Sequence, residues 1–317
     1  MSSMQGLVDK ALDMLARNCH LEDSSDLFSI ELSTMLDELK EDFEDWDKST
    51  PDRFIFDLLV RRSKTAVVDY WETILEIMAA NCDNEKDVEL HIDMLALIEH
   101  LLSQKNLHST IIFYGEIILR MIIFPSLSWK SGNPSQKIRK ASIICLIKIM
   151  DEGLIEPKKM YGNFKDCTQR IKGCLDDDWA NDLRWSSLIA LRNFMVYVKD
   201  DLAQNDFIEF YAEILKRLDD AQDQIRLETC KTLEVMFDLL PEYWSSSLYP
   251  YTIKAIFIHL DDPNHAIQMA ITAVLKKAAR VQTKDFVEVA EECYNKHAHP
   301  VLCKNLLDFA SENFAIN

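Results

Sequence analysis

YAEILKRLDDAQDQIRLETCKTLEVMFDLL, residues 211–240, contains the pattern that decides the fold. Its first half spaces apolar residues at i, i+3, i+4 and i+7, as an amphipathic helix does, on Tyr211, Ile214, Leu215 and Leu218. A second helical stripe follows on Ile225, Thr229, Leu233, Met236, Phe237 and Leu240, and Pro241 stops it. Residues 211–240 therefore predict a helical hairpin, which needs neighbours on both sides to bury its apolar faces.

The same hairpin pattern recurs along the chain. It consists of Asp, an aliphatic residue five positions later, usually Arg next, and small or apolar residues three and seven positions after the Arg. Its aliphatic residue stands at positions 88, 138, 183, 225 and 267, which are 50, 45, 42 and 42 residues apart. A helix-pair period of about 40 to 47 residues is typical of HEAT and armadillo repeats. We therefore predict an all-α fold, a right-handed α-solenoid of HEAT-type helical hairpins.

Charged residues of this repeat have an expected structural role. In a stacked array, the Asp of one turn can bond the Arg of a neighbouring repeat, which links the two units. We predict that such a structural ladder is formed by Asp178, Asp220, Asp262, Arg139, Arg184 and Arg226.

The predicted solenoid is a single array over residues 1–317. Residues 1–48 form acidic N-terminal helices, residues 49–299 form about six HEAT-type pairs, and residues 300–317 form a C-terminal capping helix. Two helices are expected before the repeats, at residues 4–19 and 26–46. The next helix, residues 52–62, is expected to pack Phe54, Ile55, Leu58 and Leu59.

Composition excludes several functional classes. The net charge is −18, and 15 Asp and Glu stand against 5 Lys and Arg in residues 1–60. Nucleic acid is not an expected partner, because phosphate binding needs clustered Lys and Arg. The expected partner is a basic protein segment.

The chain is expected to be soluble and cytoplasmic, with no membrane partner. The longest apolar run, Ile111–Phe124, has 14 residues and contains Glu116 and Arg120, so we predict no membrane-spanning segment. The eight cysteines are scattered over apolar faces, which favours reduced core thiols over a disulfide framework.

Four strings resemble a known family beyond the generic repeat. They are TPDRFIFDLLV (50–60), LSWKSGNPSQKIRKASIICLIKIM (127–150), YAEILKRLDDAQDQIR (211–226) and IHLDDPNHAIQMAITAVLKK (258–277). Together they resemble the C-terminal repeats of the HEAT-repeat dynein axonemal assembly factor family, from about residue 50 to about residue 307. The resemblance implies a cytoplasmic, non-enzymatic scaffold that helps to preassemble axonemal dynein arms. Its implied partners are dynein intermediate and heavy chains and chaperone-type assembly factors.

Catalytic motifs are absent from the sequence. It contains no Gly-rich phosphate loop, no GxSxG and no HExxH. The iron-binding HEAT enzymes that resemble deoxyhypusine hydroxylase use His-Glu pairs, but none of the eight histidines here is followed by Glu. We expect no enzyme activity and no cofactor. Besides the assembly scaffold, a generic HEAT scaffold or transport adaptor that binds a basic protein remains an alternative.

Two clusters have residue types that carry function elsewhere. Cys293, His297, His299 and Cys303 could ligate zinc, but Pro300 interrupts the helix and the spacing differs from that of zinc fingers, so core residues are the other interpretation. The second cluster is acidic and aromatic and has two interpretations, a solvated helix end or a surface that recruits a basic, amphipathic partner. Its candidate partner-binding residues are Asp37, Glu38, Glu41, Asp42, Glu44, Asp45 and Trp46.

Overall fold

The computed structural model describes residues 2–83, 85–240, 244, 247–294, 296 and 300–313. These residues form helices and connecting turns, without a strand, so the predicted all-α class is confirmed. The chain divides into two compact units, Met1–Ile155 (unit 1) and Glu156–Asn317 (unit 2). The expected single array over residues 1–317 stays a prediction.

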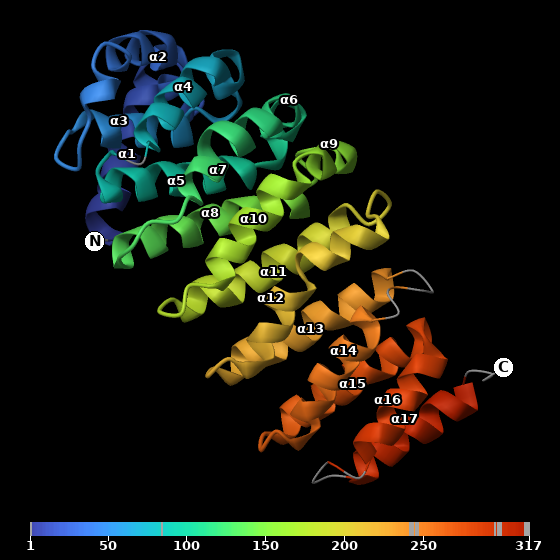
Figure 1. The fold of residues 1–317 in the computed structure, drawn as a ribbon. Coiled ribbons are helices and arrows are strands. Elements are labelled where there is room, and N and C mark those ends of the chain that lie inside the picture. Colours follow the sequence, from blue (N-terminus) through green and yellow to red (C-terminus); the bar gives the residue numbers. More distant parts are fainter. Residues whose placement is uncertain are drawn as a thin grey trace. The chain divides into compact units, whose positions relative to one another are not determined.

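Unit 1 consists of helices that pack against one another (Figure 1). The α-helices are α1 (Ser2–Asn18), α2 (Ser24–Leu39), α3 (Asp52–Arg62), α4 (Trp71–Asn81), α5 (Val88–Leu102), α6 (His108–Ile118), α7 (Phe124–Ser126) and α8 (Asn133–Asp151). Short 3₁₀ turns are η1 (Phe43–Asp45), η2 (Lys64–Tyr70) and η3 (Lys105–Leu107), and η4 (Leu119–Ile123) is a π-helix. The second helices of successive pairs pack together, α3 on α5 and α5 on α8.

Unit 2 repeats the same arrangement with α11, α13, α15 and α17 side by side (Figure 1). Its helices are α9 (Pro157–Gly162), α10 (Phe164–Leu175), α11 (Asn181–Tyr197), α12 (Tyr211–Lys216), α13 (Asp223–Leu239), α14 (Leu248–Phe257), α15 (His265–Val281), α16 (Thr283–Tyr294) and α17 (Pro300–Asn313). Short 3₁₀ turns are η5 (Gln204–Glu209), η6 (Arg217–Asp219) and η7 (Ile258–Asp261). The hairpin predicted for residues 211–240 is therefore α12–η6 followed by α13.

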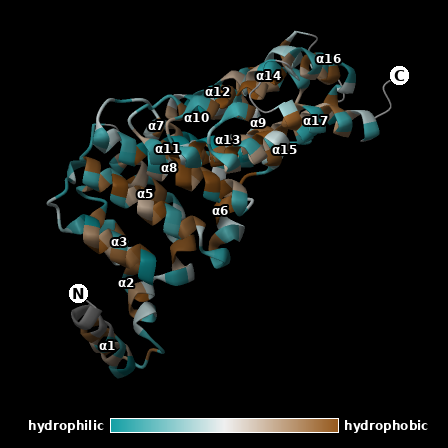
Figure 2. Cartoon of the chain, turned by 90° about the horizontal axis from the view of Figure 1, so that it is seen from below, coloured by the Kyte–Doolittle hydropathy of each residue, from teal (hydrophilic) through white to brown (hydrophobic). Residues whose placement is uncertain are grey.

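The core of each unit lies between the packed helices. In α13 the predicted apolar stripe is confirmed, because Ile225, Leu233 and Met236 are at most 1% exposed. Burying one such side chain is worth about 1.5 to 3 kcal/mol, so each repeat contributes several of these increments. Hydrophobic residues, brown in Figure 2, alternate with hydrophilic ones along helices such as α3 and α5.

Gly115 allows a close approach between two segments of unit 1. A Cβ atom on this residue would lie 2.3 Å from the backbone oxygen of Leu154 and 2.8 Å from Cγ1 of Ile155. Since a backbone oxygen cannot give way as a flexible side chain does, only glycine lets α6 pass this segment. The position of α6 therefore depends on the absence of a side chain.

The helical stretch Lys105–Ser126 is the most apolar helical path of unit 1 that the membrane test selects. It has 22 residues and, by length and composition alone, is apolar enough to cross a membrane. It contains the apolar run Ile111–Phe124, which η3, α6, η4 and α7 extend at both ends into one longer helical path. Its inner residues, such as Ile111 and Leu119, are fully buried within unit 1, and a core helix passes the same test of composition.

Candidate protein-binding surfaces

The acidic segment Asp37–Trp46 surrounds the end of α2. The sequence predicted one helix over residues 26–46, but α2 ends at Leu39 and a separate turn, η1, follows. Carboxylates that gather at a helix C-terminus face the negative end of its dipole, which disfavours a longer helix. The bend also buries two aromatic rings, Phe43 at 7% and Trp46 at 2% exposure.

The carboxylates of the acidic segment point to solvent while its indole holds the turn. Asp37, Glu38, Glu41, Asp42, Glu44 and Asp45 are all exposed. Trp46 Nε1 donates a hydrogen bond to Asp42 Oδ1 at 3.0 Å, so Asp42 and Trp46 stabilise the segment itself. Within the described part of the chain, Glu38, Glu41 and Asp45 make no ion pair, and their charge is available to a partner.

A groove of about 260 Å³ runs beside this segment, between α2 and α3. Acidic side chains line it together with apolar ones: Met35, Glu38, Leu39, Glu41, Asp42, Asp52 and Ile55. The outer face of α3 continues the apolar surface, with Phe54 at 56%, Ile55 at 38% and Leu58 at 44% exposure. Carboxylates and an uncovered apolar face thus lie side by side. This combination suits a basic, amphipathic segment.

The predicted packing of α3 was partly wrong. Leu59 is buried as expected, but Phe54, Ile55 and Leu58 are exposed, and Phe56 and Val60 fill the core instead. The helix sequence DRFIFDLLVRR is apolar on more than one side, and periodicity alone does not say which side a neighbour covers. An apolar pattern on both sides of a surface helix was the signal for this second face.

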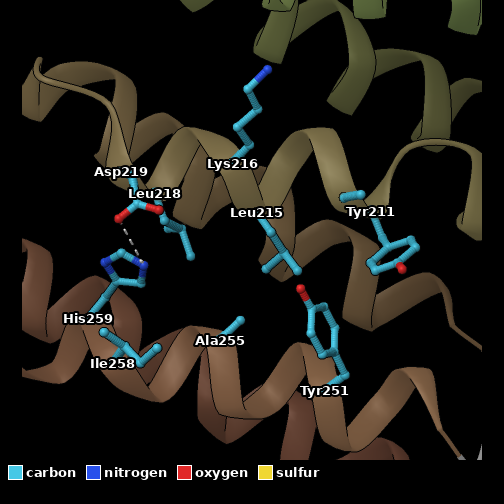
Figure 3. Close-up of a pocket in the computed structure, with 10 residues that line it drawn as sticks. Tyr211, Leu215, Lys216, Leu218, Asp219, Tyr251, Ala255, Ile258 and His259 are labelled. Carbon is cyan, nitrogen blue, oxygen red and sulfur yellow. Dashed lines mark ion pairs between the residues drawn. The ribbon is translucent and has the colours of Figure 1, made fainter.

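A second groove lies between the first helices of two successive pairs in unit 2 (Figure 3). It has a volume of about 390 Å³ between α12–η6 and α14–η7. Tyr251 and Leu215 point toward each other across it, and Tyr251 is 62% exposed. His259 Nε2 lies 3.9 Å from Asp219 Oδ1, while burial lowers the pKa of His259 and favours its neutral form. The groove presents the rings of Tyr211, Tyr251 and His259 and aliphatic side chains, with Lys216 and Asp219 as its charged groups.

Residues of the predicted ladder are found mostly between successive second helices of unit 2. Arg184 donates to both carboxylate oxygens of Asp220, at 2.7 Å from Nε and 3.0 Å from Nη2. Arg226 Nη1 lies 2.9 Å from Asp262 Oδ2. Burial raises the pKa of Asp220, but hydrogen bonds from Arg184 and from the Gln222 backbone outweigh it and hold that pKa below its usual range.

The other two ladder residues have different surroundings. The Asp178 side chain is exposed, and its backbone oxygen accepts a bond from Arg184 Nη1 at 2.8 Å. Arg139 is 1% exposed, and its Nε donates to the backbone oxygen of Ser135 at 3.4 Å. Arg184, Asp220, Arg226 and Asp262 thus serve connections inside the fold.

The possible zinc cluster is only partly visible. His297 and His299 lie outside the described residues, whereas Cys293 and Cys303 are buried. Burial raises the pKa of Cys293 and raises that of Cys303 to about 11. Across the described residues, no group of three or more His, Cys, Asp or Glu side chains is placed to hold a metal ion.

Comparison with known proteins adds to this geometry. A curated human protein is 24% identical over 317 residues, which cover 95% of this chain and 36% of that protein. A Xenopus laevis protein that carries the same name as the human protein is 22% identical, over 97% of this chain and 37% of its own length. The chain is similar to dynein axonemal assembly factor 5. It spans about a third of the length of these relatives. The resemblance predicted from the sequence is confirmed, and no protein-family model matches.

The chain's similarity to solved structures concerns its fold alone, unlike its similarity to dynein axonemal assembly factor 5. A designed armadillo repeat protein matches with a TM-score of 0.50 at 12% identity, over 74% of this chain and 98% of its own. At that identity the match says nothing about ligands. It confirms the predicted fold class, an α-solenoid of helical hairpins.

Proposed function

We propose that this chain is a non-catalytic scaffold segment in the cytoplasmic assembly of axonemal dynein. Similarity to dynein axonemal assembly factor 5 over 95% of the chain supports this role. The helical repeats offer long surfaces for binding, and the described residues hold no metal-binding cluster. Its mechanism is binding of client chains, without making or breaking covalent bonds.

The surface between α2, η1 and α3 is the proposed client site. The observation that carries it is the row of exposed carboxylates on the acidic segment, next to exposed Phe54, Ile55 and Leu58. A basic segment of a client would place Lys or Arg against the carboxylates and apolar side chains on α3. Dynein intermediate and heavy chains and chaperone-type assembly factors are the proposed partners.

The test is co-precipitation from the cytoplasm of ciliated cells. The variant Glu38→Lys/Glu41→Lys/Asp45→Lys reverses three charges without breaking the bond between Asp42 and Trp46. A matched control, Asp200→Lys/Glu288→Lys/Glu291→Lys, makes the same charge change at exposed sites of unit 2. We expect wild type and control to retain dynein chains and the first variant to lose most of them.

The other outcomes separate the alternatives. Equal recovery of dynein chains by both variants would remove the α2–η1–α3 surface from the proposal. An acidic surface also suits a transport adaptor or a phosphatase scaffold. Recovery of transport factors or phosphatase subunits, with no dynein chain, would favour that function instead.

A further inference from the structure

The outer face of α6 and η4 carries a stripe of exposed apolar side chains. Phe113 is 79%, Ile117 48% and Met121 60% exposed, at successive spacings of four residues. In a regular α-helix, positions four apart drift around the axis. The wider π-turn of η4, Leu119–Ile123, reduces that drift between Ile117 and Met121. Contiguous apolar surface on a charged protein marks an interaction site.

A groove continues this stripe toward α4. Its volume is about 270 Å³, and its floor is formed by Leu75 and Ala79 from α4 and by Ile117 and Met121. Since the floor lies between two helices, a third helix can lay an apolar ridge into it, as packed helices do elsewhere. The groove and the stripe together form one apolar surface.

Acidic side chains border this surface on α4. Glu72 and Glu76 are exposed, one turn apart, and α4 contains no Lys or Arg. Glu72 accepts a hydrogen bond from Tyr114 at 3.4 Å, and Glu76 pairs with Lys40 at 2.6 Å between half-exposed side chains. Unit 1 as a whole has 27 Asp and Glu against 16 Lys and Arg. The rim therefore favours a positively charged neighbour.

We propose that the groove between α4 and α6–η4 binds an amphipathic helix of a partner protein, with its apolar stripe in the groove and Lys or Arg beside Glu72. This site is separate from the α2–η1–α3 surface, because its floor is apolar and formed by other helices.

Charge favours this occupant over two others. Interfacial membrane helices present Lys and Arg to anionic headgroups, whereas Glu72 and Glu76 border this surface. A second copy of the chain would bring two acidic rims together, which is repulsive. A basic amphipathic helix meets both the apolar floor and the acidic border.

The probe is a labelled synthetic peptide with Leu at helical spacing on one face and Lys beside it. Its control has the same composition in scrambled order, without the stripe. Binding to the full chain is measured by fluorescence polarisation. We expect the amphipathic peptide to bind at least about tenfold more tightly than the scrambled one, since burial of a few Leu side chains exceeds the ~1.4 kcal/mol this requires.

Neutral substitutions locate the binding site without altering charge. We expect Ile117→Gln/Met121→Gln to lower the affinity for the amphipathic peptide by about tenfold. Phe113→Gln should lower that affinity less. Ile30→Gln, at an exposed site of α2, serves as the matched control and should bind as wild type does. Thermal unfolding of each variant verifies that it is folded, and the more exposed Phe113 provides the second variant.

Several results would overturn the proposal. These are equal binding of amphipathic and scrambled peptides, or unchanged binding by both groove variants. The protein is also tested for binding to phosphatidylserine vesicles and for dimerisation in sedimentation velocity. Either interaction would overturn the proposal if Ile117→Gln/Met121→Gln abolished it. The Glu38→Lys/Glu41→Lys/Asp45→Lys variant should keep the preference for the amphipathic peptide.

Discussion

His91 shows how a single buried group ties stability to pH. It is 1% exposed, and its Nε2 lies 2.7 Å from Ser126 Oγ. Ser126 Oγ itself donates to the backbone oxygen of Ile122 at 2.6 Å, so it accepts from an Nε2–H of His91. The neutral tautomer protonated on Nε2 therefore fits this site. A second proton on Nδ1 would place a charge in the core.

Unit 1 should lose stability in mild acid because of His91. Burial is the main cause that lowers the pKa of His91 from 6.5 to about 4; nearby Asp83 acts against it and Lys130 with it. Between these values only the unfolded chain takes up the proton, so the free energy of unfolding falls as pH decreases. The full loss is about 3 kcal/mol, at about 1.4 kcal/mol for each unit of pKa. Urea unfolding between pH 7 and pH 4 measures it.

The variant His91→Gln isolates this contribution. Glutamine can still donate a hydrogen bond to Ser126 but does not titrate. We expect its stability to depend less steeply on pH, whatever its stability at pH 7. Identical slopes for wild type and variant would show that other groups cause the acid sensitivity.

Bonds between neighbouring elements hold the repeats of unit 2 in register. The Arg184–Asp220 pair joins α11 to the turn before α13, and the Asp220 side chain is 2% exposed. Removing Arg184 leaves that carboxylate in the interior, with Arg217 Nη1 at 3.7 Å from its Oδ2. We expect Arg184→Ala to lower the free energy of unfolding by about 3 kcal/mol, as breaking one side of a buried pair does. Denaturant unfolding tests this.

A surface pair between two other helices is the control. Lys254 and Glu292 join α14 to α16 at 2.6 Å, but both are about half exposed. Lys254→Ala should cost at most about 1 kcal/mol, because water replaces an exposed ion pair well. Adding Asp220→Asn to Arg184→Ala should recover part of the loss. If Arg184→Ala and Lys254→Ala lowered the free energy of unfolding equally, burial of the ion pair would not explain the loss.

Elements also show where sequence patterns succeed. The stripe of α13 has one apolar face and was predicted residue by residue, because only one packing buries it. The end of α2 and the packing face of α3 were not predicted correctly. The end of α2 depends on the burial of Phe43 and Trp46. The packing face of α3 depends on which of its sides meets α2 and α5.

At the scale of the whole molecule, charge should govern affinity. The chain carries −18, of which −10 lies in residues 1–60. Raising salt from about 0.1 M to about 1 M shortens the Debye length from about 10 Å to about 3 Å. We expect a Gly-Lys peptide without apolar residues to bind in low salt and to be released in high salt, because only charge attracts it. Fluorescence polarisation measures this.

The charge-reversed variant Glu38→Lys/Glu41→Lys/Asp45→Lys should bind this peptide more weakly and with a smaller salt dependence. A Gly-Glu peptide of the same length is the negative control. An affinity that is unaffected by salt would contradict an electrostatic origin.

The sequence by itself determined the all-helical class, the hairpin period and the acidic character of residues 1–60, because helical periodicity and charge are properties of local sequence. Tertiary structure alone decided which apolar residues stay uncovered. Phe54 on α3 and Phe113 on α6 are of the same residue type as phenylalanines in the core, yet both are exposed. A side chain's exposure depends on the neighbouring helix that packs beside it, and that neighbour is chosen by contacts between segments distant in the chain.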